Sequence, residues 1–314
     1  MNKKKLLIAT SSVAAGVGIL YGAVGKVLFD KTLTRHALDE ARKNPDTDPE
    51  VAELYANCPE CHGCRKWFDE NSNNIVINSA TGERIYCSFI DRRSDVYVIV
   101  CHGYTSSPRD MALYARRFAD MGYNVLLPAM RAHGKSEHKI CTMGWLDRLD
   151  VIDWINYINS VCPKAKIVLH GVSMGSATVM NVTGENLPSN VKCAVADCGY
   201  TSVWDVFSVQ VREQYNLPPF PFLNAANTVS KLFAKFDFKQ ASPLRQVKKS
   251  STPTLFIHGD RDDFVPFWML HPIYEAASCE KQKLIVSGAL HAVSAVLNPE
   301  LYWSTVEDFI GRYL

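Results

Sequence analysis

The stretch LHGVSMGSAT, residues 169–178, places one serine between glycines at the point where an apolar run ends. Gly171, Ser173 and Gly175 alternate with other residues, and small residues follow them. A sharp turn from a strand into a helix crowds its central residue, and a glycine on each side relieves that crowding. The pattern therefore predicts an exposed serine hydroxyl above the end of a strand. A glycine-rich turn with an incidental serine would look the same, so the surrounding sequence has to decide.

From Asn74 onward the chain alternates between short β-rich runs and helix-length segments. The segment SATGE (79–83) suits a hairpin between the first two runs, whereas the later runs are nearly continuous apolar stretches, typical of strands covered on both faces. This alternation predicts an α/β fold with a mostly parallel, doubly wound sheet of eight strands. The runs are NIVIN (74–78), RIYCSFI (84–90), VYVIVCH (96–102), YNVLLPA (123–129), AKIVLHG (165–171), VKCAVAD (191–197), PTLFIHG (253–259) and QKLIVSG (282–288).

A serine hydroxyl needs a base within hydrogen-bond reach and a third group that orients the base. The loop DRDDFVP (260–266) follows one strand and offers three aspartates, and His291 follows the last strand. The order serine, acid, histidine is the one that such folds use at the carboxyl ends of their strands. Four aspartates are candidates for the acid: Asp260, Asp262 and Asp263 in this loop, and Asp197 at the end of an earlier strand.

Five motifs at strand ends, in this order, make residues 74–314 resemble the α/β-hydrolase superfamily. Within it, the chain is similar to membrane-anchored bacterial serine hydrolases of the esterase and lipase type. One departure is Leu290, where such enzymes commonly carry glycine; leucine there could narrow the site without removing the base. The motifs are HGYTSS (102–107), RAHGKS (131–136), GVSMG (171–175), HGDRDDFVP (258–266) and GALHA (288–292).

The resemblance implies a role for each site residue. Ser173 is the expected nucleophile, His291 the base and Asp262 the acid, and the backbone N–H groups of Tyr104 and Met174 are the expected oxyanion donors. The other polar residues of the motifs are expected to organise turns rather than react: His102, His258, Arg131 and His133.

Residues 204–240 interrupt the alternation of strands and helices and resemble a lid over the active site. Five apolar side chains of this segment either form an acyl pocket or simply pack the lid onto the domain: Phe207, Leu217, Phe220, Phe222 and Leu223.

These features predict a serine hydrolase that cleaves carboxylic esters of small molecules or lipids through an acyl-enzyme, with no metal or organic cofactor. A serine peptidase is an alternative because the same triad cleaves amides. A non-catalytic binding protein that retained the fold is a second alternative, which a complete triad disfavours.

The first residues predict a membrane anchor. After MNKKK, the run from Leu6 to Gly25 carries no charge, and as a helix it would span about 30 Å, close to the thickness of a bilayer. We expect a cytoplasmic tail over residues 1–5, a transmembrane helix over 6–29, a juxtamembrane stalk or cap over 30–70 and the hydrolase domain over 71–314, held outside the cytoplasm at the cell membrane. A signal peptide cleaved after residues 23–25 (AVG) and a buried soluble helix are the alternatives.

Composition and cysteine spacing limit which nucleic-acid or metal-binding functions the sequence supports. A formal net charge of +2 on 314 residues gives no broad positive field for nucleic acid. The ten cysteines include the cluster CPECHGC (58–64), which resembles half of a metal site but is followed by no second C-x-x-C. We therefore expect this cluster to be an exposed segment with free or paired thiols. The sequence leaves the oligomeric state open.

Overall fold

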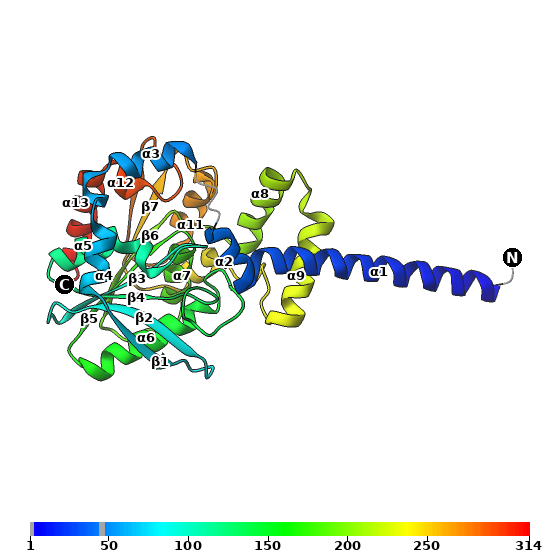
Figure 1. The fold of residues 1–314 in the computed structure, drawn as a ribbon, viewed down its shortest axis with the longest axis horizontal. Coiled ribbons are helices and arrows are strands. Elements are labelled where there is room, and N and C mark those ends of the chain that lie inside the picture. Colours follow the sequence, from blue (N-terminus) through cyan, green and yellow to red (C-terminus); the bar gives the residue numbers. More distant parts are fainter. Residues whose placement is uncertain (1–2, 44–47) are drawn as a thin grey trace.

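The computed structural model describes residues 3–43 and 48–314, and within the first helix it describes side chains from Gly16 on, except Val17. The eight predicted runs form one sheet in the order β1-β2-β4-β3-β5-β6-β7-β8 (Figure 1). β1 pairs antiparallel with β2, and β2 with β4, while all other neighbours are parallel. The predicted eight-stranded, mostly parallel sheet is confirmed. The strands are β1 (Asn73–Asn78), β2 (Arg84–Ile90), β3 (Val96–Cys101), β4 (Asn124–Pro128), β5 (Lys166–Val172), β6 (Val191–Asp197), β7 (Thr254–Gly259) and β8 (Lys281–Val286).

Helices cover both faces of the sheet. In β3, Val98 and Val100 pack under α4, α5 and α13, whereas Ile99 and Cys101 face α6 and α7. This two-sided burial explains why the strand sequences are continuous apolar runs rather than alternating ones. The helices are α1 (Lys3–Leu33), α2 (Arg35–Lys43), α3 (Pro49–Asn57), α4 (Cys64–Asn71), α5 (Ala112–Asp120), α6 (Asp147–Val161), α7 (Met174–Thr183), α8 (Val203–Tyr215), α9 (Pro219–Ala234), α10 (Pro243–Val247), α11 (Leu270–Ala276), α12 (Ser294–Leu297) and α13 (Pro299–Gly311).

The first helix projects from the body of the protein and joins it through its second half (Figure 1). Phe29 and Leu33 of α1 are buried in the same core as α6 and α7. At Gly25 the backbone of α1 touches α9 so closely that an added Cβ would lie 2.4 Å from the carbonyl oxygen of Ala225. Glycine is therefore required where the two helices cross.

Within the described part of the chain, none of the helices combines the length and the apolar character that crossing a bilayer requires. Gly25 and Phe29, which lie at the end of the predicted membrane segment 6–29, are buried inside the protein. The side chains of residues 6–15 lie outside those that the structure describes.

After the end of α1, the described part of residues 30–70 contains α2, α3, the 3₁₀ turn Pro59–Cys61 and most of α4. The expectation that the cysteine cluster is exposed is wrong for two of its thiols, because Cys58 and Cys64 are buried with Phe68 against α5 and the sheet. Leu38 of α2 is likewise buried in the main core. The apolar faces of these short helices pack on the surface of the domain. In an extended stalk these faces would have remained exposed to water.

The segment predicted as a lid folds into α8 and α9, between β6 and α10. Both helices stand beside the sheet on the side from which α1 departs (Figure 1). Leu223 and Val229 of α9 and Val206 of α8 are buried in the main core, so the segment packs firmly against the domain.

We predict that Gly25→Leu destabilises the fold, because the new side chain would collide with the Ala225 carbonyl. Overpacking of this kind costs about 1–3 kcal/mol. Gly22→Leu is the matched control, since an added Cβ there meets no atom within 4 Å and the gain in helix propensity is the same. Thermal unfolding of both variants is the measurement. Equal melting temperatures for the two would contradict the packing of α1 on α9.

Candidate active site

Ser173 lies in the turn between β5 and α7, as its sequence predicts. Its backbone has φ 57° and ψ −117°, a conformation that non-glycine residues rarely adopt. The flanking glycines are required by space: an added Cβ would lie 2.2 Å from the Gly175 carbonyl oxygen at Gly171, and 2.0 Å from the Cys101 carbonyl oxygen at Gly175. The tight turn therefore presents the Ser173 hydroxyl at the carboxyl end of the sheet.

His291 and Asp262 complete a chain of hydrogen bonds to this serine. The Nε2 atom of His291 lies 2.8 Å from Ser173 Oγ, and its Nδ1 atom lies 2.8 Å from Asp262 Oδ2. The carboxylate can accept only from a protonated Nδ1, which leaves Nε2 free to accept the serine proton. The three predicted residues are thus brought together in the arrangement that activates a serine.

Asp262 is fixed by more than the histidine. Its Oδ1 atom accepts a hydrogen bond of 2.9 Å from the backbone N–H of Val265, and His258 Nε2 lies 3.3 Å from its Oδ2. Burial alone would raise the pKa of this carboxyl, but the adjacent His291 and His258 hold its pKa below the ordinary value. Asp262 is therefore an ionised, immobile acceptor for the imidazole.

The three other candidate acids lie elsewhere. Asp260 accepts hydrogen bonds from the Gly288 N–H at 2.6 Å and from the Ser287 hydroxyl at 3.1 Å, which braces the loop that precedes His291. Asp263 is exposed to solvent. Asp197 is fully buried, and neither of its carboxyl oxygens has a hydrogen-bond partner among the described residues. Burial raises the pKa of Asp197 to about 7, well above the ordinary value of an aspartate.

The expected oxyanion donors flank the serine. Met174 is the first residue of α7, so its backbone N–H has no acceptor within the helix. Tyr104 follows Gly103, where an added Cβ would lie 3.5 Å from Ser173 Cβ. Both residues line a cavity with Ser173, and the Tyr104 hydroxyl donates a 2.5 Å hydrogen bond to the Thr32 carbonyl of α1.

Two buried histidines hold the loops around the site. His102 contacts the Gly103 carbonyl through Nδ1 at 2.8 Å, and its Nε2 accepts from the Met130 N–H at 3.1 Å. His133 accepts from the Thr105 N–H at 3.2 Å. Burial drives the pKa of His102 well below its ordinary value and lowers that of His133 to about 4, so both rings are neutral structural groups.

Arg131, a further motif residue, makes a buried bidentate contact with Asp150, at 2.8 and 2.6 Å. Its backbone N–H also donates to Asp147 at 2.8 Å. These bonds join the loop after β4 to α6. The arginine and the two histidines thus occupy the organising positions expected of them.

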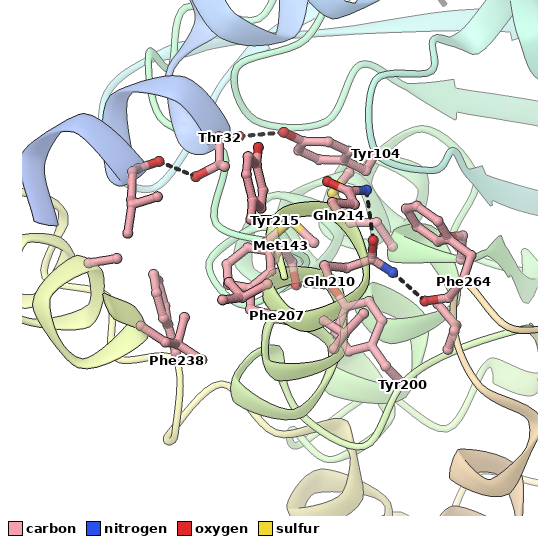
Figure 2. A pocket seen from close by; sticks show the side chains of 18 residues that line it. Thr32, Tyr104, Met143, Tyr200, Phe207, Gln210, Gln214, Tyr215, Phe238 and Phe264 are labelled. Carbon is pink, nitrogen blue, oxygen red and sulfur yellow. Dashed lines mark hydrogen bonds between the residues drawn. The ribbon is translucent and has the colours of Figure 1, made fainter. Parts of the chain in front are cut away.

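An apolar cavity opens beside Ser173 (Figure 2). Of the five predicted pocket residues, Phe207 and Leu223 line it, whereas Leu217, Phe220 and Phe222 do not. The N-terminal helix supplies a wall that the sequence did not indicate. The residues of α1, α8 and α9 that line the cavity are Leu28, Thr32, Val206, Phe207, Gln210, Val211, Gln214, Tyr215, Leu223 and Ala226.

A second, more polar cavity meets the first at the serine. Ser173, Tyr104 and Phe264 line both, but His291 lines only the second. Helix α3 forms one wall of this second cavity through Val51 and Tyr55. The sequence did not indicate that α3 would line the site. The reactive groups thus sit where two spaces of different polarity join.

Among the described residues, one group of three potential metal ligands has its ligand atoms within 4.8 Å of one another: Cys198, Asp262 and His291. The CPECHGC cluster forms no such group in the described part of the chain, so the structure does not support a metal site there. Asp262 and His291 are already joined by the short hydrogen bond of the serine site. The prediction that the protein uses no metal or cofactor stays a prediction.

Comparisons with known proteins place the chain in a family. A family model described as alpha/beta hydrolase fold matches residues 96–219. The chain is 30% identical to Uncharacterized protein YqkD of Bacillus subtilis (strain 168), over 98% of each chain, and 24% identical to Protein bem46 of Schizosaccharomyces pombe over 48% of this chain and 45% of that protein.

Solved structures agree. The esterase Pf2001 of Pyrococcus furiosus superposes with a TM-score of 0.65 at 25% identity, covering 79% of this chain and 93% of that one. An acylaminoacyl peptidase of Pyrococcus horikoshii shares the fold, with a TM-score of 0.58 at 16% identity over 77% of this chain and 42% of that one. The full-length match to the Bacillus subtilis relative, and the family model that spans the turn carrying Ser173, show that the chain belongs to the α/β-hydrolase superfamily.

Proposed function

We propose that the protein is a serine hydrolase that cleaves carboxylic esters through an acyl-enzyme. The observation that carries this proposal is the unbroken hydrogen-bond chain from Asp262 through His291 to Ser173, located where two cavities meet. A binding protein would have no use for an oriented acid, base and nucleophile in this order. The likeness to the esterase Pf2001 supports the same reaction class.

The reaction follows from these contacts. Ser173 Oγ attacks the ester carbonyl as its proton passes to His291 Nε2, and Asp262 stabilises the imidazolium. The backbone N–H groups of Met174 and Tyr104 stabilise the oxyanion that forms on the carbonyl oxygen. His291 then returns the proton to the departing alcohol. Water attacks the acyl-enzyme with His291 again as base, which releases the acid and restores the Ser173 hydroxyl.

The two cavities support one placement of the two halves of the substrate. The leaving alcohol must lie near His291 Nε2 to receive its proton, and His291 lines only the second, more polar cavity. The acyl group then occupies the apolar cavity, between Leu28, Phe207 and Leu223. Binding in a cavity of this character favours an apolar acyl chain. The proposed substrates are therefore esters that join an apolar acid to a more polar alcohol.

We predict that Ser173→Ala abolishes both ester hydrolysis and labelling by a fluorophosphonate probe, with little change in melting temperature. Ser176→Ala is the matched control, since its buried hydroxyl lies one turn along α7 and has no hydrogen-bond partner among the described residues. Labelling and p-nitrophenyl ester turnover are measured on both variants. Turnover that survives in Ser173→Ala would rule out this nucleophile.

We predict that Asp262→Asn lowers kcat by about 10⁴ with a much smaller effect on KM, because an amide can hold the imidazole in the wrong tautomer. Asp260→Asn and Asp197→Asn should each cost far less, since Asp260 bonds the Gly288 N–H and Asp197 has no hydrogen-bond partner among the described residues. Steady-state kinetics of the three variants is the measurement. A crippled Asp197→Asn beside an active Asp262→Asn would transfer the role of the acid to Asp197.

We predict that Leu28→Trp reduces kcat/KM for long acyl chains at least tenfold and leaves acetate esters nearly unaffected, because the larger ring would fill the apolar cavity. Val27→Trp is the matched control, since its neighbouring side chain is 53% exposed and does not line the cavity. A p-nitrophenyl series from acetate to palmitate, with anilides of the same acids, gives the profile. A uniform loss over all chain lengths would contradict the acyl assignment, and faster anilide cleavage would favour a peptidase.

A further inference from the structure

The five most exposed large apolar side chains among the described residues all lie on two helices. They are each 66–75% exposed, whereas no other large apolar side chain in the described part exceeds 55%. Large exposed apolar side chains that gather in one region of a protein mark an interaction surface. The five residues, called here the outer apolar set, are Ile19 and Leu20 on α1 and Phe220, Leu232 and Phe233 on α9.

The outer apolar set occupies the side of the protein from which α1 departs. The two helices cross at Gly25 and Ala225, and the Tyr21 hydroxyl lies 3.5 Å from Thr228 Oγ1 of α9. Beyond this crossing α1 runs free of the body (Figure 1), and an added Cβ at Gly16, Gly18 or Gly22 would meet no atom within 4 Å. Phe233 lies back against the base of α1, in a hollow shared with Lys26.

The charges around this set are mostly positive. α9 contains one charged residue, Lys231, and Lys235 follows its last turn. Lys26 and Lys31 are exposed on the inner half of α1, while its sequence from Leu6 to Gly25 carries no charge. Two acids temper the pattern, because Asp30 pairs with Lys26 and Asp237 with Lys231. An apolar surface with lysines at its margin matches a membrane interface with anionic head groups.

We propose that the outer apolar set binds the surface of a lipid bilayer that contains anionic phospholipid. The free helix α1 places Ile19 and Leu20 in the lipid, and the ends of α9 seat Phe220, Leu232 and Phe233 at the same interface. A second protein copy would have to cover both a projecting helix and a helix that crosses it, and it would gain nothing from the flanking lysines.

The position of this surface also indicates which substrates reach the serine, an inference that rests on the proposed function. Leu28 of α1 and Leu223 of α9 line the apolar cavity beside Ser173. The helices that face the bilayer are thus the walls of the acyl-binding space. An acyl chain that leaves the bilayer between them would reach the serine with little exposure to water, which makes membrane lipids the favoured esters.

Fluorescence quenching by brominated phospholipid tests the bilayer contact without any turnover. The full-length chain is reconstituted in vesicles of phosphatidylcholine and phosphatidylglycerol, with or without bromine on the acyl chains. Phe220→Trp and Phe233→Trp place a reporter in the outer apolar set. Val161→Trp is the matched control, because Val161 is 55% exposed at the end of α6, away from this set. The wild-type signal, from six native tryptophans, is subtracted.

We expect the bromine-dependent loss of fluorescence to increase over wild type in both α9 variants and to stay unchanged in Val161→Trp. Quenching that is equal in all three variants, or a chain that fails to float with the vesicles, would overturn the proposal. In the absence of lipid, a doubled particle size together with α9 tryptophans that are already shielded from water would show that a second copy covers this surface. That result would also overturn the proposal. Ser173→Ala should bind vesicles as wild type does, so a failed esterase assignment leaves this test intact.

Discussion

The backbone strain at Ser173 is the constraint around which the rest of the site is arranged. A residue with a side chain holds φ 57° only when its surroundings compensate for the strain. Here the compensation comes from contact: Gly175 abuts the Cys101 carbonyl at the end of β3, and the Ser173 N–H donates a 2.9 Å hydrogen bond to the Asp197 carbonyl at the end of β6. The turn is thereby fixed to both neighbouring strands, and the loop after β3 is held beside the serine.

The N-terminal helix is part of the site as well as of the surface. The Thr32 carbonyl accepts the hydrogen bond of Tyr104, whose backbone supplies one proposed oxyanion donor, and the Leu33 carbonyl accepts another from the Cys141 N–H at 2.7 Å. Leu28 lines the apolar cavity from the same helix. A displacement of α1 would therefore disturb both the acyl wall and the loop that carries Tyr104. This coupling links the packing at Gly25 to the chemistry at Ser173.

The sheet and the serine site could be predicted from the sequence because their signals are local. Buried parallel strands are continuous apolar runs, and the turn at Ser173 requires glycines whose spacing is visible in the sequence. The sequence singled out Asp262 among four aspartates only through the resemblance to the α/β-hydrolase superfamily. The folded loop shows why the neighbouring aspartates do not bond His291. Asp260, for example, braces the Gly288 N–H.

The roles of α1 and α3 could not be predicted in this way. An uncharged helical run indicates burial but not whether lipid or protein buries it, and the sequence does not show that Gly25 meets Ala225 across 200 residues of chain. In the same way, the polar stretch before Asn73 gave no sign that Tyr55 would reach the second cavity. Both contributions depend on packing between distant segments, which leaves no periodic pattern in either one.

The central claim is that Ser173 forms an acyl-enzyme, and the mass of the protein during turnover tests it most directly. Rapid mixing with p-nitrophenyl octanoate, acid quenching and intact mass spectrometry should reveal one octanoyl group per chain, and peptide mapping should locate it on Ser173. A burst of p-nitrophenol equal to the enzyme concentration should accompany it. Turnover with no acylated protein, or an acyl group on another residue, would contradict the account.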